Sequence, residues 1–114
     1  MDDCIFCKII SGDIPSDILY RDDEVIAFRD VNPVAPTHIL IVPVEHLVTT
    51  QDIPDDNISL TCKMVQAANR LADQEGITEK GYRLVINCGE QGGQLVGHLH
   101  MHLIGGRQLS SSLG

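Results

Sequence analysis

The chain has 114 residues, 43% of them hydrophobic, and a formal net charge of -8 at pH 7. It is long enough for one modest hydrophobic core and too short for two, so we expect one folded domain over residues 1–114. Its acidic balance excludes a nucleic-acid coat protein, because phosphate backbones are bound by clustered Lys and Arg, but it does not exclude a single bound nucleotide. The sequence also has no apolar run of about eighteen residues and no charged start before an apolar stretch, so we expect a soluble cytoplasmic protein with no membrane partner.

Hydrophobic spacing and turn residues predict the elements of the first half of the chain. Apolar residues at helical spacing near the start indicate a short helix, which Gly12 and Pro15 end. Two strand-like runs separated by Asp22 and Asp23 indicate a hairpin, and the β-branched run that follows it ends at Pro43. The expected elements are therefore a short helix within residues 4–15, strands over 18–20 and 25–28, and a strand over 37–43.

The second half predicts one long helix and two strands. Apolar residues follow helical spacing from about 54 to 75, and Gly76 provides the stop signal. Residues 81–89 and 97–106 are strand-like, and the glycine-rich segment 90–94 forms the turn between them. Short strands with hairpin connections and one long helix imply an antiparallel α+β fold.

The stretch HLHMHLI, residues 98–104, alternates histidine with apolar residues. Because side chains alternate across a strand, His98, His100 and His102 are expected on one face, with the apolar residues packed beneath the long helix. Three histidines at this spacing are compatible with two kinds of site, a metal site and a nucleophilic catalytic site. Histidines at this spacing can ligate zinc and leave a position open for water; alternatively, one imidazole attacks phosphorus while a second moves the proton. The spacing alone does not choose between them.

Cys4 and Cys7 form a C-x-x-C pair in a chain without a secretory signal, which favours metal or redox chemistry over a structural disulfide. The pair offers two of the four ligands of a tetrahedral zinc site. A redox role is disfavoured because no strand precedes the pair. Two reduced thiols packed as small hydrophobic groups are the alternative.

Five segments together resemble the histidine triad (HIT) family of nucleotide hydrolases and transferases. HLHMHLI matches the His-φ-His-φ-His-φ-φ signature, and the trailing GGRQL is similar to the Hint branch, the purine nucleoside phosphoramidases. The other matching segments, which extend the resemblance over nearly the whole chain, are IFCKIISGDIPS, DVNPVAPTHILIVPVEH and GYRLVINCGEQGGQ. The resemblance implies a five-stranded antiparallel sheet with one long and one short helix, continued across a homodimer.

The resemblance also implies an activity, the hydrolysis of purine nucleoside 5'-phosphoramidates, which are AMP or GMP derivatives. His100 would be the nucleophile that forms a nucleotidyl-histidine. His102 would contact the phosphate and help to protonate the leaving amine, which departs poorly as an anion. His98 and His38 would complete the imidazole network, and Asp30 would hold the ribose hydroxyls.

Further positions match the family's nucleotide-binding residues. The implied apolar walls around the base are Ile5, Phe6, Phe28 and Val31. The implied phosphate and leaving-group side comprises Asn87, Gly93, Gln94 and Leu95. Leu95 departs from the family pattern, which often has Ser, Thr or another polar residue there, and a leucine cannot donate a hydrogen bond to the leaving group.

Some bacterial members of the family carry a zinc held by two cysteines and two histidines. The matching positions are Cys4, Cys7, His46 and His98. A site closed by four protein ligands has no open position, so we expect a structural zinc and no organic cofactor. Two alternatives stay open: a zinc-dependent hydrolase that uses the triad as ligands, and a nucleotide-binding or scaffold protein with vestigial catalysis, which the departure at Leu95 keeps open.

Overall fold

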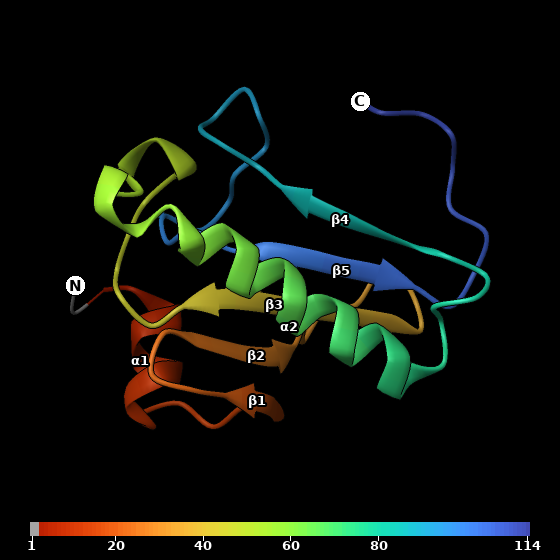
Figure 1. Ribbon diagram of the computed structural model, residues 1–114, viewed down its shortest axis with the longest axis horizontal. Helices are drawn as coiled ribbons and strands as arrows, with labels where there is room; N and C mark the ends of the chain where they lie inside the picture. Colours follow the sequence, from red (N-terminus) through yellow and green to blue (C-terminus); the bar gives the residue numbers. More distant parts are fainter. Residues whose placement is uncertain (1–2) are drawn as a thin grey trace.

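The computed structural model describes residues 3–114 and contains a five-stranded sheet with two α-helices (Figure 1). The strands lie in the order β1-β2-β3-β5-β4, and every neighbouring pair is antiparallel. The predicted α+β fold is therefore confirmed. The elements are α1 (Ile5–Ser11), β1 (Ile18–Arg21), β2 (Val25–Arg29), β3 (Thr37–Pro43), two 3-10 turns (Thr50–Asp52 and Asp55–Asn57), α2 (Ser59–Glu75), β4 (Tyr82–Ile86) and β5 (Met101–Gly105).

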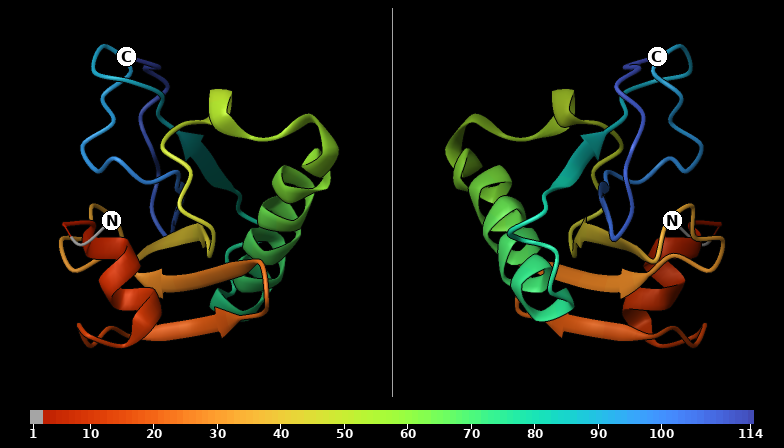
Figure 2. Two further views of the ribbon diagram at one scale, coloured as in Figure 1. Left: turned by 90° about the vertical axis from the view of Figure 1, so that its left-hand side faces the viewer. Right: turned by 90° about the vertical axis from the view of Figure 1, so that its right-hand side faces the viewer.

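The central strand β3 separates two apolar cores. All seven of its residues are buried, which accounts for its unbroken apolar sequence. Ile39 and Ile41 face the larger core beneath α2, whereas Leu40 and Val42 face the smaller core beneath α1. Figure 2 shows the two helices on opposite sides of the sheet. Each aliphatic side chain buried in this way contributes roughly 2 kcal/mol to folding.

Glycines end both helices as predicted. Gly12 and Gly76 follow α1 and α2 with φ of 85° and 73°, the left-handed conformation that glycine adopts without steric cost. The start of the long helix differs from the prediction, because the turn after Pro54 is a separate 3-10 turn and α2 begins at Ser59. Ile58, at the junction, offers no side-chain cap to the first free N–H groups of α2.

The two C-terminal strands are shorter than predicted. The predicted strand over 97–106 is wrong in its first part, because β5 begins only at Met101. Met101 pairs with Ile41 of β3 and Ile86 of β4. Pro43 ends β3 and has no N–H with which to extend the ladder, so residues 97–100 run outside it, held by a bond from the Leu99 N–H to the Leu47 carbonyl (2.7 Å). The predicted strand over 81–89 is likewise limited to 82–86.

The alternation of side chains predicted for this segment nevertheless holds on the apolar side. Leu99, Met101 and Leu103 are all buried in the core beneath α2. The histidines between them therefore face away from α2, but only His102 of the three lies on a paired strand.

An ion pair ties the end of α2 to the sheet beside the start of β3. Arg29 donates two hydrogen bonds of 2.8 Å to the Glu75 carboxylate, and the Thr37 hydroxyl donates a third at 3.1 Å. The hydrogen bonds from Arg29 lower the pKa of Glu75 below its usual value. This anchor fixes the strand end that carries His38.

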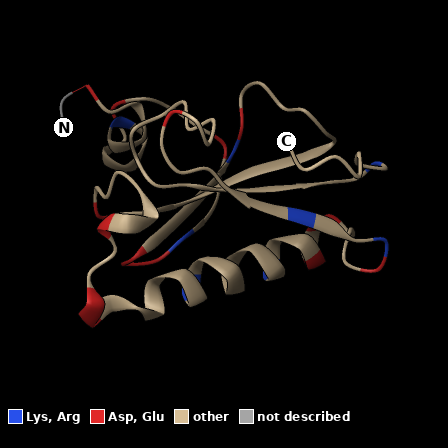
Figure 3. Cartoon of the chain, turned by 90° about the horizontal axis from the view of Figure 1, so that it is seen from above, with Lys and Arg blue, Asp and Glu red and all other residues tan. Residues whose placement is uncertain are grey.

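The charged residues of the fold do not form a basic surface. Lys and Arg are separated along the chain, on both helices, on β1, β2 and β4 and in turns (Figure 3). Within residues 3–114, no helix is both long and apolar enough to cross a membrane.

Candidate active site and metal cluster

The five histidines lie close together although they come from three separate parts of the chain. His38 is on β3, His46 follows β3, and the other three are at and just before β5. Their rings form a nearly continuous group, with centroids 4.6 Å apart for His46 and His98, 5.0 Å for His100 and His102, and 5.1 Å for His38 and His102. The hydrogen bonds of these rings divide them into two clusters.

His100 is buried and has a defined orientation. Its Nδ1 lies 2.7 Å from the carbonyl oxygen of His98. Because a carbonyl can only accept, Nδ1 carries the proton and donates it, which leaves the lone pair of the neutral ring on Nε2. The Nε2 atom is thus the nucleophilic position of this residue.

His38 and His102 form a hydrogen-bonded pair beside Asp30. The N–H of Val34 donates to Nδ1 of His38 at 3.2 Å, so the proton of neutral His38 is on Nε2. This Nε2–H donates to Nδ1 of His102 at 2.9 Å and lies 3.5 Å from the Asp30 carboxylate. His102 must therefore carry its own proton on Nε2, where it can donate to a bound group.

Burial controls the charge of His102. Burial, followed by the neighbouring His100 and His38, lowers the pKa of His102 to about 4, while Asp30 opposes the shift. Without a ligand, His102 is therefore neutral at pH 7. An anionic phosphoryl group placed beside it would favour the protonated form and raise this pKa.

The second cluster, which we call the metal cluster, consists of Cys4, Cys7, His46 and His98. Nδ1 of His98 lies 3.3 Å from Sγ of Cys4 and 3.6 Å from Sγ of Cys7, and Nδ1 of His46 lies 3.2 Å from Sγ of Cys7. A tetrahedral zinc with bonds of about 2.3 Å to sulfur and about 2.0 Å to nitrogen would separate S and N by about 3.5 Å. The four ligand atoms all lie within 4.8 Å of one another, so the residues fit a zinc ion.

The tautomer of His98 also suits metal binding. Nε2 of this fully buried residue lies 2.9 Å from the carbonyl oxygen of Pro43, so it carries the proton and donates it. The lone pair on Nδ1 is thereby directed at the two sulfur atoms. Two soft sulfur and two imidazole ligands form a donor set typical of structural zinc.

The predicted base walls differ in exposure. Phe6 and Phe28 are buried against each other, with centroids 5.5 Å apart and ring planes at 68°. Ile5 is 47% exposed and Val31 is 86% exposed, so these two are open to a ligand.

The glycine-rich loop before the histidines is braced by its own side chains. Asn87 donates to the Gly92 carbonyl (2.7 Å), and Gln94 donates to the carbonyls of Val48 (2.6 Å) and Val96 (3.0 Å). Gly93 has a φ of 81°, which keeps the turn tight. Leu95 is 95% exposed, so its apolar side chain is not packed in the core.

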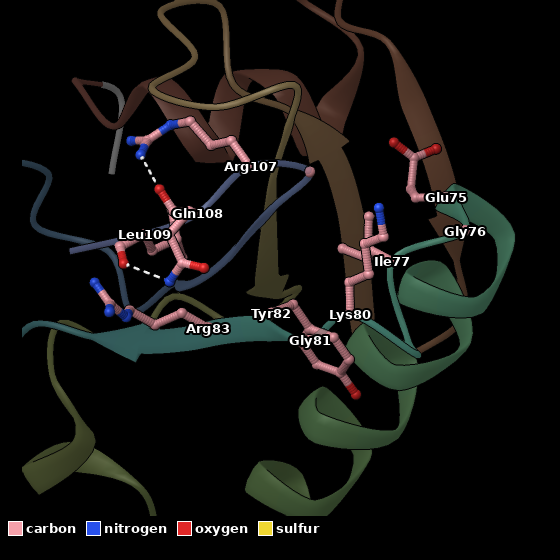
Figure 4. A pocket seen from close by; sticks show the side chains of 11 residues that line it. Glu75, Gly76, Ile77, Lys80, Gly81, Tyr82, Arg83, Arg107, Gln108 and Leu109 are labelled. Carbon is pink, nitrogen blue, oxygen red and sulfur yellow. Dashed lines mark hydrogen bonds between the residues drawn. The ribbon is translucent and has the colours of Figure 1, made fainter. Parts of the chain in front are cut away.

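One cavity lies away from the histidines. It has a volume of about 820 Å³ and is formed by the end of α2, the start of β4 and the segment after β5 (Figure 4). Its arginines are engaged with the protein itself: Arg107 donates to the Val34 carbonyl and Arg83 to the Ser110 carbonyl. No residue predicted for the active site or the metal cluster lines it. A second cavity, of about 460 Å³, borders Cys4, Ile5, His46 and Leu95.

Sequence reasoning missed the main-chain groups of the site. The carbonyls of Pro43 and His98 and the N–H of Val34 determine which nitrogen of each ring carries the proton. Main-chain groups are present in every residue, so no residue type signals them. The contact of Phe6 with His100, at a centroid distance of 5.1 Å, was also missed.

Comparison with known proteins identifies related sequences and structures. A family model described as "HIT domain" matches residues 11–109. The chain is 50% identical over 112 residues to "Purine nucleoside phosphoramidase" of Escherichia coli K12, covering 98% of this chain and 94% of that protein. It is 46% identical over 110 residues to "14 kDa zinc-binding protein" of Brassica juncea, covering 95% and 96%. The solved structure "HIT family hydrolase" from Clostridium thermocellum superposes with a TM-score of 0.95 at 46% identity, covering 99% of this chain and 98% of that one.

Proposed function

This chain belongs to the HIT domain family and is a hydrolase of the histidine triad type, and from this premise we propose that it cleaves the P–N bond of purine nucleoside 5'-phosphoramidates. The observation that carries the mechanism is the 2.7 Å hydrogen bond from Nδ1 of His100 to the His98 carbonyl. This bond leaves Nε2 of His100 unprotonated, as a nucleophile must be.

In the proposed first step, Nε2 of His100 attacks the α-phosphorus. The P–N bond breaks, and its electron pair stays on the amine nitrogen, which takes up a proton and leaves as a neutral amine. The product on the enzyme is a nucleotidyl-His100. In the second step, water attacks the same phosphorus, and the nucleoside 5'-monophosphate leaves as His100 is regenerated.

We propose that His102 manages the proton for both steps. Its Nε2–H is the free donor of the hydrogen-bonded pair with His38, and it can bond a phosphoryl oxygen or the leaving nitrogen. The bound phosphoryl anion raises the pKa of His102 and makes its imidazolium form available as an acid. While His102 is neutral, the Nε2–H of His38 keeps Nδ1 of His102 as the acceptor; in the imidazolium form Nδ1 of His102 donates instead, and Nε2 of His38 must accept. Asp30 lies at the outer end of this chain of groups.

The nucleotide would lie beside His100 and His102. Asp30 would bond the ribose hydroxyls, and the apolar walls at Ile5, Phe6, Phe28 and Val31 would surround the purine. The phosphate side would be formed by Asn87, Gly93, Gln94 and Leu95. Two of these side chains, on Asn87 and Gln94, already brace the loop, so its contact with phosphate would fall to main-chain N–H groups.

We also propose a structural zinc at Cys4, Cys7, His46 and His98. Its support is the fit of the four ligand atoms and the name of the Brassica relative. A zinc bound there would supply a cross-link between α1 and the segment before β5. His100 and His102 remain outside the metal cluster, so the chemistry described above belongs to the chain's own groups.

A homodimer is the assembly that we propose for this site. The strand β4 is an edge of the sheet, and all five of its residues are only half-buried, including Leu84, Val85 and Ile86. An edge strand with apolar residues on both faces favours pairing with a second copy, which would continue the sheet.

The test is the release of AMP from adenosine 5'-phosphoramidate by the wild type and by His100→Ala, each with and without a chelator. We expect the wild-type activity to survive the chelator and the variant to lose at least about 1,000-fold. Loss of wild-type activity on chelation, with the fold intact by circular dichroism, would instead identify a metallohydrolase. Binding of AMP without turnover in any sample would identify a nucleotide-binding protein, the alternative that the departure at Leu95 keeps open.

A further inference from the structure

Phe6 lies between the metal cluster and the proposed nucleophile. Its side chain is only 6% exposed. The ring meets that of His100 at a centroid distance of 5.1 Å and an interplanar angle of 83°, and that of His98 at 5.9 Å and 67°. These are edge-to-face contacts, which are favourable and depend on orientation.

The position of Phe6 depends on the metal-cluster cysteines on either side of it. Cys4 is the N-cap of α1, and its sulfur accepts a hydrogen bond from the Cys7 N–H at 3.3 Å. Both sulfurs reach His98, so they bring the first turn of α1 against the histidine segment. The one side chain of this turn that is buried is that of Phe6.

The ring of His100 needs this support. Among residues 3–114, its one side-chain hydrogen bond is the one from Nδ1 to the His98 carbonyl. If the ring turned over about its Cβ–Cγ bond, this hydrogen bond would be lost and the lone pair of Nε2 would leave the attacking position. A ring packed perpendicular to the imidazole restricts that rotation.

We propose that Phe6 is a positioning residue that couples the metal cluster to the orientation of His100. This inference rests on the proposed nucleophilic role of His100. It gives Phe6 a task in addition to that of a base wall: loss of the base wall would change nucleotide affinity, whereas loss of the positioning contact would change the rate of attack. It also gives the metal cluster an effect on the chemistry without placing a metal ion near the reacting atoms.

The test compares Phe6→Leu with Ile9→Val. Ile9 is buried in the same apolar core and on the same helix, and it makes none of the ring contacts with the histidines. For each zinc-loaded variant, the measurements are zinc content, the dissociation constant of AMP, the single-turnover rate with adenosine 5'-phosphoramidate, and the 15N imidazole signals of His100, which report the tautomer.

We expect Phe6→Leu to keep its zinc and, at a substrate concentration that saturates each variant, to form the intermediate at least about tenfold more slowly than the wild type. Its His100 signals should show a mixture of the two tautomers. Ile9→Val should resemble the wild type in all four measurements. Phe6→Tyr, which keeps the ring, should restore most of the rate.

The wild type provides a test that needs no variant. Removal of zinc with a chelator should shift the His100 imidazole signals in the same direction as Phe6→Leu does. Unchanged His100 signals in the zinc-free chain would overturn the proposal. It would also be overturned if Phe6→Leu weakened AMP binding without slowing the reaction, or if Ile9→Val slowed the reaction equally. These signals do not depend on turnover, so a failure of the proposed function, seen as full activity of His100→Ala, remains distinguishable.

Discussion

The two histidine clusters of this chain differ in the partners of each ring, and these partners suit the same side chain to different purposes. In the metal cluster, His46 and His98 direct Nδ1 at cysteine sulfurs, and a main-chain carbonyl holds the other nitrogen of His98. In the other cluster, His38 and His102 bond each other beside a carboxylate. Sulfur partners suit a metal ion, whereas imidazole and carboxylate partners suit the movement of a proton.

The clusters are joined at one point of the main chain. His98 places its side chain in the metal cluster and its carbonyl oxygen on Nδ1 of His100. Neighbouring histidines of the triad are therefore expected to have separate tasks, and substitutions should separate their effects.

The largest expected difference between the clusters is in metal content. His98→Asn removes a ligand and a fully buried donor, so we expect it to lose most of its zinc and about 3 kcal/mol or more of stability. His102→Asn should keep the zinc content of the wild type. Elemental analysis and urea unfolding check both variants, and a fully zinc-loaded His98→Asn would show that the assignment of the metal cluster is wrong.

A smaller effect is expected from breaking the His38–His102 pair. His38→Leu removes the donor that holds the tautomer of His102, so turnover should fall by about 10- to 100-fold while zinc content stays unchanged. His38→Gln still offers an N–H and is the matched control, and it should keep more of the rate. Equal rates for the two variants in a steady-state assay would count against control of the tautomer by His38.

The pH dependence of stability should distinguish His102 from an exposed histidine. Its pKa is lowered to about 4, so the folded chain binds this proton less readily than the unfolded chain does. The contribution of neutral His102 to the free energy of unfolding is therefore fully present above about pH 6.5. It is lost as the pH falls towards 4.

Replacing His102 with Gln tests this linkage. His102→Gln should lose less stability than the wild type between pH 7 and 4.5, by about 1 kcal/mol after allowance for solvent screening of the half-buried ring. Urea unfolding at the two pH values measures the difference, and identical losses would contradict the lowered pKa.

The smallest expected effect concerns Leu95, at the edge of the proposed leaving-group side. Leu95→Ser should change stability by less than about 0.5 kcal/mol, because the side chain is 95% exposed. Its hydroxyl could bond the phosphoramidate, so kcat/KM should rise several-fold. Leu95→Ala, which has no donor, should not show this gain; an equal gain would mean that relief of bulk, rather than a hydrogen bond, is the cause.

The elements of the fold that depend on local signals were predicted well. Gly12 and Gly76 end the helices because they take up positive φ, a property of the residue itself. The last strand was overestimated because its start depends on a distant residue, Pro43, which ends the neighbouring strand. Pairing between strands is decided in space, and a pattern within one strand does not contain it.

The candidate site, like the fold, could be predicted from the sequence only in part. The spacing of the triad and the C-x-x-C pair selected three histidines and two cysteines, and the resemblance to the HIT family added His38 and His46. The structure brings these residues close together, and their roles stay predictions. Which nitrogen of each ring is free could not be predicted, because the main-chain groups of Val34, Pro43 and His98 decide it. Phe6 and Phe28 looked alike in the sequence, and only the packed structure places Phe6 against His100.

The most direct test of the central claim, covalent catalysis at His100, is to trap the intermediate. The zinc-loaded chain is mixed with adenosine 5'-phosphoramidate, quenched in alkali within one turnover, digested and analysed by mass spectrometry. We expect an adenylyl group on His100 in the wild type and none on that peptide in His100→Ala. Turnover without any adduct, or an adduct located on His102, would contradict the account.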